Sequence, residues 1–147
     1  MSRYPRNPTK NESKSKKEIR LLSNRLWKII SEYVRRRDGK CVCCDKTEHL
    51  QCGHYWHGWL DFHEINLNAQ CSNCNNPSRG GGKIPEYTMY LVKKYGHLIL
   101  NFLEFLKCLE RRVHDKTGKL NHVGMELTPE LLNRLIVYYQ TKLAKLK

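Results

Sequence analysis

Four cysteines in two Cys-x-x-Cys pairs have the spacing that most clearly predicts chemistry, Cys41 with Cys44 and Cys71 with Cys74. Thiolates at this spacing are common ligands of tetrahedral zinc, and four of them leave no open position on the metal. We therefore predict a structural zinc site. Cys43 stands beside Cys44, but only Cys44 lies at the two-residue gap from Cys41, so the spacing favours Cys44.

A histidine between the two pairs, in the run Gly53-His54-Tyr55, is a candidate for catalysis. A neutral imidazole can take a proton from water near neutral pH while a divalent cation binds a scissile phosphate. His54 is therefore a candidate general base of a phosphodiesterase. The residues leave other interpretations open: a histidine that only forms hydrogen bonds, an extra zinc ligand, or His57 or His63 in its place.

The segment between the cysteine pairs must position this histidine. It should form a β-hairpin or an Ω-loop, with a short strand over residues 50–55 that ends near His54. A brief helix is expected to begin after Cys74. A strand histidine that faces an oxygen ligand at a helix start can form a one-metal phosphodiesterase site. Asn66 and Asn75 are candidates for this site, although asparagine is also common in turns and helix caps.

The rest of the chain is predicted to be helical, which gives a mainly helical α+β fold. Apolar residues recur at helical spacing over 16–37, where Asp38-Gly39 should end the helix. Helices are also expected over about 86–95, from 97 to about 112, and after Thr128 as N-cap. The predicted order is a basic disordered arm over 1–15, the helix 16–37, a zinc-stabilised core over 38–96 and a C-terminal helical hairpin over 97–147, with a polar turn over 115–124.

The charge of the chain points to a polyanionic partner. It has 27 Lys and Arg against 14 Asp and Glu, a net charge of +13 in 147 residues. Nucleic acid is the commonest partner of such a protein, although some proteins are basic without binding it. The candidate phosphate contacts are Arg35, Arg36, Arg37, Arg79 and Lys83.

The cysteine count and the hydropathy pattern indicate a reducing compartment. Residues 1–17 are polar and basic, without the apolar core of a signal peptide. The longest apolar stretch, Leu98–Leu106, is too short and too polar to span a membrane. Seven cysteines are an odd number, and four of them have metal-ligand spacing. We therefore expect Cys43, Cys52 and Cys108 to be free thiols in the cytoplasm.

The order of these motifs resembles the HNH, or His-Me finger, endonucleases, and more closely the phage NinG/Rap family of recombination nucleases. The resemblance covers about residues 25–105. The segments that carry it are 33–38, 41–44, 51–55, 64–66, 70–75 and 86–87, followed by Leu91 and Tyr95-Gly96.

The resemblance implies a ββα-metal finger embedded among helices, with a role for each matching residue. His54 matches the general base, Asn66 matches the residue that orients the base or its loop, and Asn75 matches a ligand of a catalytic Mg²⁺ or Mn²⁺. The four paired cysteines match the ligands of a structural Zn²⁺. The implied substrate is branched or single-stranded DNA at recombination or replication intermediates, in the cytoplasm of the bacterial host.

Three departures from the family pattern bear on these roles. Gly53 stands where many His-Me enzymes carry an acidic metal ligand, and Gln51 stands where some family members carry an acid. Asp61 or Glu64 therefore becomes a further candidate cation ligand. The loop after His54 has His57 and Asp61 where members often have arginines. Pro77 and the run Gly80-Gly81-Gly82 interrupt the expected metal-binding helix, so Arg79 and Lys83 are expected to hold DNA from a loop.

Two other functions remain open from the sequence. A zinc-stabilised nucleic-acid-binding protein without catalysis would explain the missing acids at Gly53 and Gln51, and it predicts salt-sensitive binding without cleavage. A protein-interaction adaptor would use the C-terminal helices as its docking surface. A homodimer is possible, because cutting a junction needs two active sites, but no heptad seam indicates one.

Overall fold

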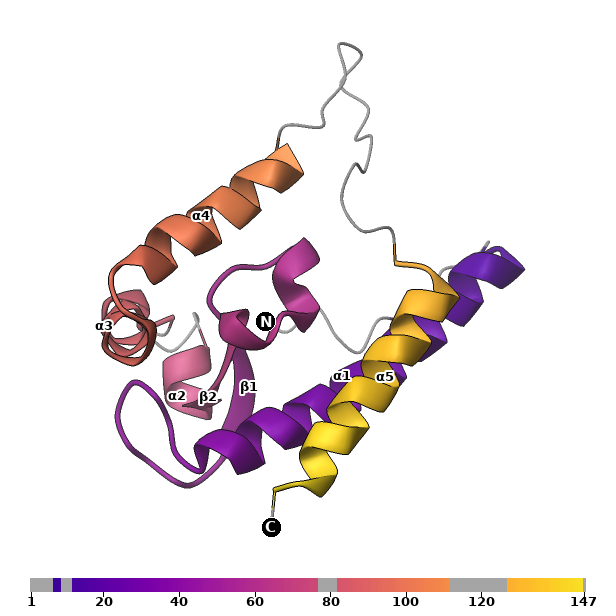
Figure 1. Ribbon diagram of the computed structural model, residues 1–147. Coiled ribbons are helices and arrows are strands. Elements are labelled where there is room, and N and C mark those ends of the chain that lie inside the picture. Colours follow the sequence, from indigo (N-terminus) through magenta and orange to yellow (C-terminus); the bar gives the residue numbers. More distant parts are fainter. Residues whose placement is uncertain (1–6, 9–11, 77–81, 112–126, 147) are drawn as a thin grey trace.

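The computed structural model describes residues 7–8, 12–76, 82–111 and 127–146. It is mainly helical, with one small antiparallel sheet (Figure 1). None of the helices in these ranges is long and apolar enough to cross a membrane. The elements are α1 (Lys14–Asp38), β1 (Leu50–His54), the 3-10 turns η1 (Trp59–Phe62) and η2 (Glu64–Asn66), β2 (Leu67–Cys71), α2 (Ser72–Asn75), α3 (Ile84–Tyr95), α4 (Leu98–Arg111) and α5 (Pro129–Ala144).

Both ends of α1 follow from local sequence. The Ser13 side chain caps the first turn by accepting a hydrogen bond from the Lys16 N–H at 3.4 Å. Gly39 has a φ of 66°, and its N–H donates to the Arg35 carbonyl at 3.0 Å. A left-handed residue is easiest for glycine, so Gly39 ends the helix where the sequence predicts. The helix begins two residues before the expected start.

β1 and β2 form an antiparallel hairpin whose two ends are chemically different. Leu50 pairs with Cys71 at one end, and His54 pairs with Leu67 at the other. The outer edge of β2 is also occupied, because the Ala69 N–H donates to the Asp38 carboxylate at 2.7 Å. The hairpin therefore places one cysteine pair and the candidate histidine at opposite ends of the same strands.

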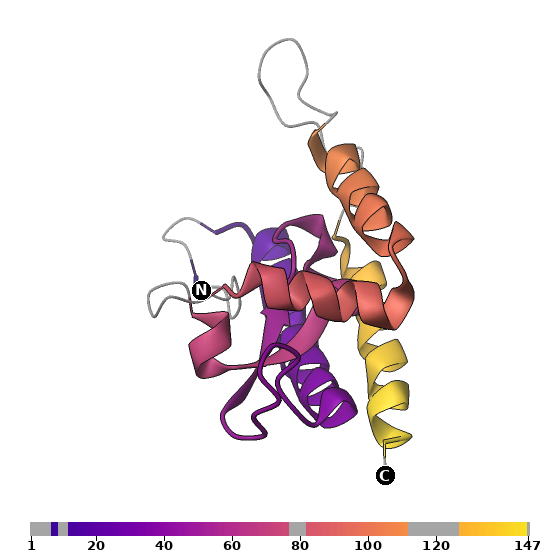
Figure 2. The ribbon, with the colours of Figure 1, turned by 90° about the vertical axis from the view of Figure 1, so that its left-hand side faces the viewer.

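Helices cover the hairpin on both sides (Figures 1 and 2). One core contains residues of α1, α5 and the sheet, including Leu26, Ile30, Cys52, Ala69 and Ile136. A second core contains Leu60, Tyr87, Leu91, Ile99 and Leu103, from η1, α3 and α4. Because successive strand residues point to opposite faces, Cys52 faces α1 while Gly53 faces Tyr87 of α3.

The last helix begins as predicted, but it does not form a hairpin with α4. Thr128 accepts a hydrogen bond from the Leu131 N–H at 3.2 Å and caps α5. α5 then packs along α1, whereas α4 packs on α3 and η1 (Figure 1). The expected hairpin over 97–147 is therefore corrected: α4 and α5 pack mainly against different elements rather than against each other. The predicted polar turn over 115–124 lies outside the described residues, as does most of the predicted arm.

Candidate functional site

The four paired cysteines converge to one cluster. The Sγ atoms of Cys41, Cys44, Cys71 and Cys74 all lie within 4.8 Å of one another. Cys44 Sγ is 3.7 Å from Cys71 Sγ and 3.5 Å from Cys74 Sγ. Tetrahedral zinc, with bonds of about 2.3 Å to sulfur, sets its ligands about 3.8 Å apart. The cluster could therefore hold a structural zinc ion, and Cys43 lies outside it.

Two short turns present these sulfurs. The Cys41 carbonyl accepts a hydrogen bond from the Asp45 N–H at 2.9 Å, which closes the first turn. Cys71 ends β2, and α2 begins immediately after it. The expectation that a helix begins after Cys74 is corrected, because the helical turn starts at Ser72 and is itself what brings Cys74 back to the cluster.

His54, the last residue of β1, is buried beside two further potential metal ligands. Its ring stacks on Trp27 of α1 with the centroids 4.9 Å apart, and its side chain is 2% exposed. His54 Nε2 lies 3.7 Å from Asp61 Oδ1, and His57 Nδ1 lies 3.9 Å from the same oxygen. These three residues, the histidine cluster, could hold a metal ion. The sequence pointed to each of them, but not to their grouping.

The surroundings of His54 keep its imidazole neutral. Burial, and then the neighbouring His57, lower the pKa of His54 to about 4. Its Nε2 has no hydrogen-bond partner among the described residues. A group with this pKa holds a proton poorly near neutrality, so it is a weak general base, but its lone pair can bind a cation. The Gly58 N–H donates to Asp61 Oδ1 at 3.0 Å and holds that carboxylate in place.

Asn66 fixes the loop that carries His57 and Asp61. Its side chain is fully buried, and its Oδ1 accepts a hydrogen bond from the Trp56 N–H at 2.9 Å. Its Nδ2 donates to the carbonyls of Trp56 at 2.7 Å and of Leu60 at 3.1 Å. These three bonds tie both ends of the loop to one side chain. Asn66 is therefore a positioning residue for the histidine cluster.

Asn75 is not part of this cluster. Its Nδ2 donates to the Gln51 side chain at 2.9 Å. Gln51 precedes His54 by three residues on β1, so the two side chains point to opposite faces of the sheet. The hydrogen bond to Gln51 thus holds the Asn75 side chain on the face of the sheet opposite His54, and its predicted role as a cation ligand stays a prediction.

The comparison with protein families settles the relationship of the chain. A family model described as Bacteriophage Lambda NinG protein matches residues 2–146. The chain belongs to the NinG family. No curated protein and no solved structure matches it. The family part of the sequence prediction is confirmed, while the wider likeness to HNH endonucleases stays a prediction.

In this NinG-family chain, Arg37 serves the fold. It pairs with Asp38 at 2.7 Å and donates to the Leu67 carbonyl at 2.8 Å and to Asn68 Oδ1 at 3.1 Å. Burial opposes its charge, but Asp38 outweighs this and raises the pKa of Arg37. With a side chain only 14% exposed, Arg37 joins the end of α1 to β2 and has little surface left for a phosphate.

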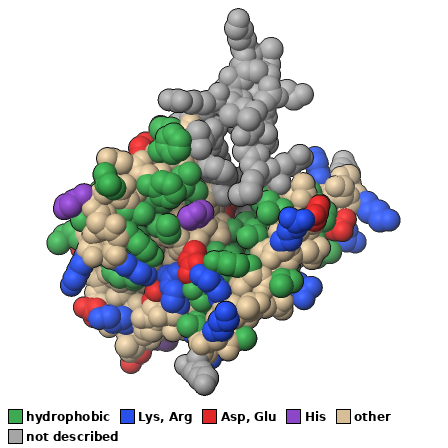
Figure 3. Space-filling model, viewed as in Figure 1, with side chains coloured by type: hydrophobic (Ala, Val, Ile, Leu, Met, Phe, Trp, Pro, Cys, Tyr) green, Lys and Arg blue, Asp and Glu red, His purple; other side chains and the backbone are tan. Residues whose placement is uncertain are grey.

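The other candidate phosphate contacts differ in availability. Arg36 is exposed, although it lies 3.6 Å from Glu32 and donates to the Leu146 carbonyl at 3.0 Å. Arg35 is half-buried, and Lys83 is exposed. Arg79 lies outside the described residues. Figure 3 shows Lys and Arg scattered over the visible face, while apolar side chains gather over α4.

Glu64, a further candidate cation ligand, is held between α1 and α5 of the NinG-family fold. Tyr33 of α1 donates to its carboxylate at 2.5 Å, and Lys142 of α5 forms an ion pair with it. Burial tends to raise the pKa of Glu64, but the hydrogen bonds from Lys142 and Tyr33 outweigh it and hold the pKa below its usual value. His63 lines a different, mainly apolar cavity of about 290 Å³.

Proposed function

We propose that this NinG-family protein is a divalent-metal-dependent DNA endonuclease that acts on branched or single-stranded DNA. The observation that carries the proposal is the histidine cluster: a neutral, buried imidazole beside a second histidine and a carboxylate. Ligands of these types occur in metal-dependent hydrolytic sites. The strand, strand and helix order of β1, β2 and α2 supports the likeness to the ββα-metal finger.

The histidine cluster has a buried side, formed by His54 and Asp61, and a solvent-exposed side, formed by His57. His54 and Asp61 have side chains 2% and 3% exposed, whereas the His57 side chain is 55% exposed. A phosphate group would therefore approach from the side of His57. A divalent cation held there supplies Lewis-acid polarisation of the phosphate and lowers the pKa of water. Two imidazoles suit Mn²⁺ better than Mg²⁺, which prefers oxygen ligands.

The low pKa of His54 changes the role that the resemblance gave it. A general base works best when its pKa lies near the working pH, and the pKa of His54 is about 4. As a cation ligand, the same imidazole loses no proton when it binds. We therefore propose His54 and Asp61 as the buried cation ligands and His57 as the ligand on the open side, with Asn66 holding their loop.

The test is a cleavage assay with zinc-loaded protein on a four-way junction, a Y-fork, a single strand and a plain duplex. Each substrate is incubated with Mg²⁺, with Mn²⁺ or with no added cation. We expect Mn²⁺-dependent cuts, and a loss of about a hundredfold or more in His54→Ala and Asp61→Asn with zinc content unchanged. His97→Ala, which removes an exposed histidine that is not part of the cluster, is the matched control. Wild-type cleavage by both cluster variants would overturn the proposal.

The second candidate is a nucleic-acid-binding protein without catalysis. It is favoured by the burial of His54 and by Gly53, which stands where HNH endonucleases are expected to carry an acid. In that case the histidine cluster only stabilises its loop. Tight, salt-sensitive binding with no cuts on any substrate, under any cation, would identify this function.

A further inference from the structure

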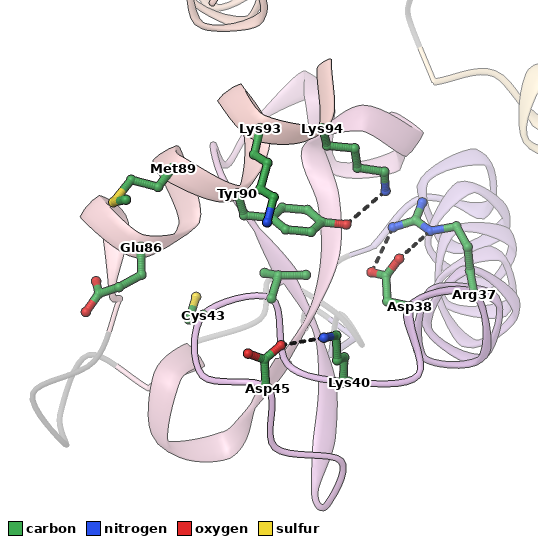
Figure 4. A pocket seen from close by; sticks show the side chains of 11 residues that line it. Arg37, Asp38, Lys40, Cys43, Asp45, Glu86, Met89, Tyr90, Lys93 and Lys94 are labelled. Atoms are coloured by element: carbon green, nitrogen blue, oxygen red, sulfur yellow. Dashed lines mark hydrogen bonds and ion pairs between the residues drawn. The ribbon is translucent and has the colours of Figure 1, made fainter. Parts of the chain in front are cut away.

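A hollow beside the turn over residues 41–45, which we call the zinc turn, is separate from the histidine cluster. Its volume is about 810 Å³, and it lies between α3, the end of α1 and the loop that carries Cys41 and Cys44 (Figure 4). Val42 and Cys43 form one wall and Tyr90, from α3, forms another. It shares no lining residue with the histidine cluster. We refer to it as the Tyr90 pocket.

The charges around the Tyr90 pocket are unequally neutralised. Each of its carboxylates has a cationic partner: Arg37 with Asp38 at 2.7 Å, Lys40 with Asp45 at 2.7 Å, and Lys83 with Glu86 at 3.6 Å. Lys93 and Lys94 also line the pocket, and no carboxylate of the described residues lies within 4.0 Å of either. The two lysines therefore leave an uncompensated positive charge at the rim.

An aromatic ring lies directly below these two lysines. Lys94 Nζ donates to the Tyr90 hydroxyl at 2.9 Å and lies 5.2 Å from the ring centroid. Figure 4 shows both lysine side chains reaching toward this ring, which is half-buried. Met89, the residue before it in α3, is 72% exposed. A half-buried ring under two cations offers a stacking surface and an anion site together.

We propose that the Tyr90 pocket binds one unpaired nucleotide of a single-stranded nucleic acid. The base would stack on Tyr90, and its phosphate would lie on Lys93 and Lys94. Aromatic rings and Lys or Arg are the two components of single-strand binding, because an unpaired base has a free face and every linkage carries a charge. Bases in a duplex are already stacked, so the pocket selects single strands. Its volume lies in the range of ordinary small-ligand pockets.

The zinc turn is part of this pocket. Val42 and Cys43 lie between the cluster cysteines Cys41 and Cys44, so the metal site fixes the wall that faces Tyr90. The pocket does not depend on the nuclease proposal, because binding can be measured without cleavage. A protein with an inactive histidine cluster would still use it.

The first experiment measures stacking directly. A single strand that contains 2-aminopurine is titrated with full-length, zinc-loaded protein, and both fluorescence quenching and anisotropy are recorded. We expect Tyr90→Ala to weaken binding about tenfold and to abolish part of the quenching, whereas Tyr90→Phe keeps the ring and both signals. Binding to a blunt duplex should be the same for all three proteins. A strand with abasic sites in place of its bases should bind the wild type and Tyr90→Ala equally.

The second experiment separates the phosphate contact from general attraction. Replacing both lysines, Lys93→Gln with Lys94→Gln, should lower the slope of log affinity against log salt by about 1 to 2 on single strands. Lys28→Gln with Lys46→Gln makes the same charge change at exposed positions outside the pocket. This control should affect single strands and duplex alike.

These experiments test the Tyr90 pocket and the nuclease proposal independently of each other. All variants are also prepared with His54→Ala, so that the binding data do not depend on cleavage. If Tyr90→Ala binds single strands as tightly as the wild type, or loses as much affinity for duplex as for single strands, the pocket proposal is wrong. Loss of cleavage with retained Tyr90-dependent binding would leave it intact.

Discussion

The two ends of the β-hairpin show two ways of building a polar centre. At the Cys71 end, four thiols from two short turns lie within 4.8 Å of one another. At the His54 end, the potential ligands come from one strand end and one loop, and Asn66 holds that loop by three hydrogen bonds. We expect the first centre to depend on a zinc ion for its geometry, whereas the second is already held by protein contacts.

This difference predicts how each end of the hairpin responds to the absence of a metal ion. A thiol cluster without zinc gives its surroundings little stability, because the turns around it have few apolar residues of their own. The histidine end is framed by η1, η2 and the main core, so it should keep its shape without a cation. The following variants test that contrast, from the largest effect to the smallest.

Cys71→Ser should have the largest effect. Removing one thiolate should eliminate zinc binding, and the lost binding energy is comparable with the whole stability of a small domain, about 5–15 kcal/mol. We expect near-zero zinc by elemental analysis and no cooperative thermal transition. The control is Cys43→Ser, which should keep one zinc per chain because Cys43 lies outside the cluster. Zinc retained in the first variant, or lost in the second, would contradict this assignment.

Asn66→Ala should come next. The substitution leaves the Trp56 N–H and the carbonyls of Trp56 and Leu60 without their partner, which should cost about 3 kcal/mol. Urea denaturation of the zinc-loaded protein measures it, with exposed Asn133→Ala as the control. Since the zinc end is independent, zinc content should not change. Equal stability of the two variants would show that the loop is held by other contacts.

Gly53→Ala should have a smaller effect. A Cβ at this position would lie 2.1 Å from Gln70 Oε1, so the Gln70 side chain must move. We expect a loss of about 2 kcal/mol by urea denaturation. In a Gln70→Ala background the same change should cost almost nothing. Equal costs in both backgrounds would mean that the backbone, rather than Gln70, excludes a side chain here.

Glu64→Gln should have the smallest effect, about 1 kcal/mol at pH 7. Because the pKa of Glu64 is depressed in the folded protein, the unfolded chain takes up the proton first as the pH falls. The stabilisation is complete above the ordinary value of 4.5 and disappears as the pH falls through the folded pKa. The difference in unfolding free energy between wild type and variant should therefore shrink from pH 7 to pH 3. A constant difference would exclude this ion pair as its cause.

The sequence predicts one end of the hairpin better than the other, for a physical reason. Ligand spacing within each Cys-x-x-Cys pair is local, so it identifies all four cysteines and favours Cys44 over Cys43. The Gly39 stop and the Thr128 cap are local in the same way. By contrast, the place of Asp61 beside His54 depends on how Asn66 folds the intervening loop, which no spacing rule gives.

The sequence also did not predict which elements pack against one another over long separations. The apolar stripes of α4 and α5 indicate that both helices are buried, but not against what. The position of Arg37 in a cluster of arginines suggested a phosphate contact, but the sequence does not show that its side chain bonds to Leu67 and Asn68, about 30 residues away. The motif likewise places Asn75 directly after the last cysteine, but it does not show that the side chain bonds to Gln51.

The packing of α5 on α1 sets an order in which the protein can fold. Arg36 donates to the Leu146 carbonyl across a separation of 110 residues, so this helix pair closes only after nearly all of the described chain has been synthesised. The zinc turns and the hairpin use much shorter separations and can form earlier on the ribosome. Until α5 emerges, the hairpin covers only part of the apolar stripe of α1. The part that α5 covers stays exposed, which makes the nascent chain a candidate client for chaperones.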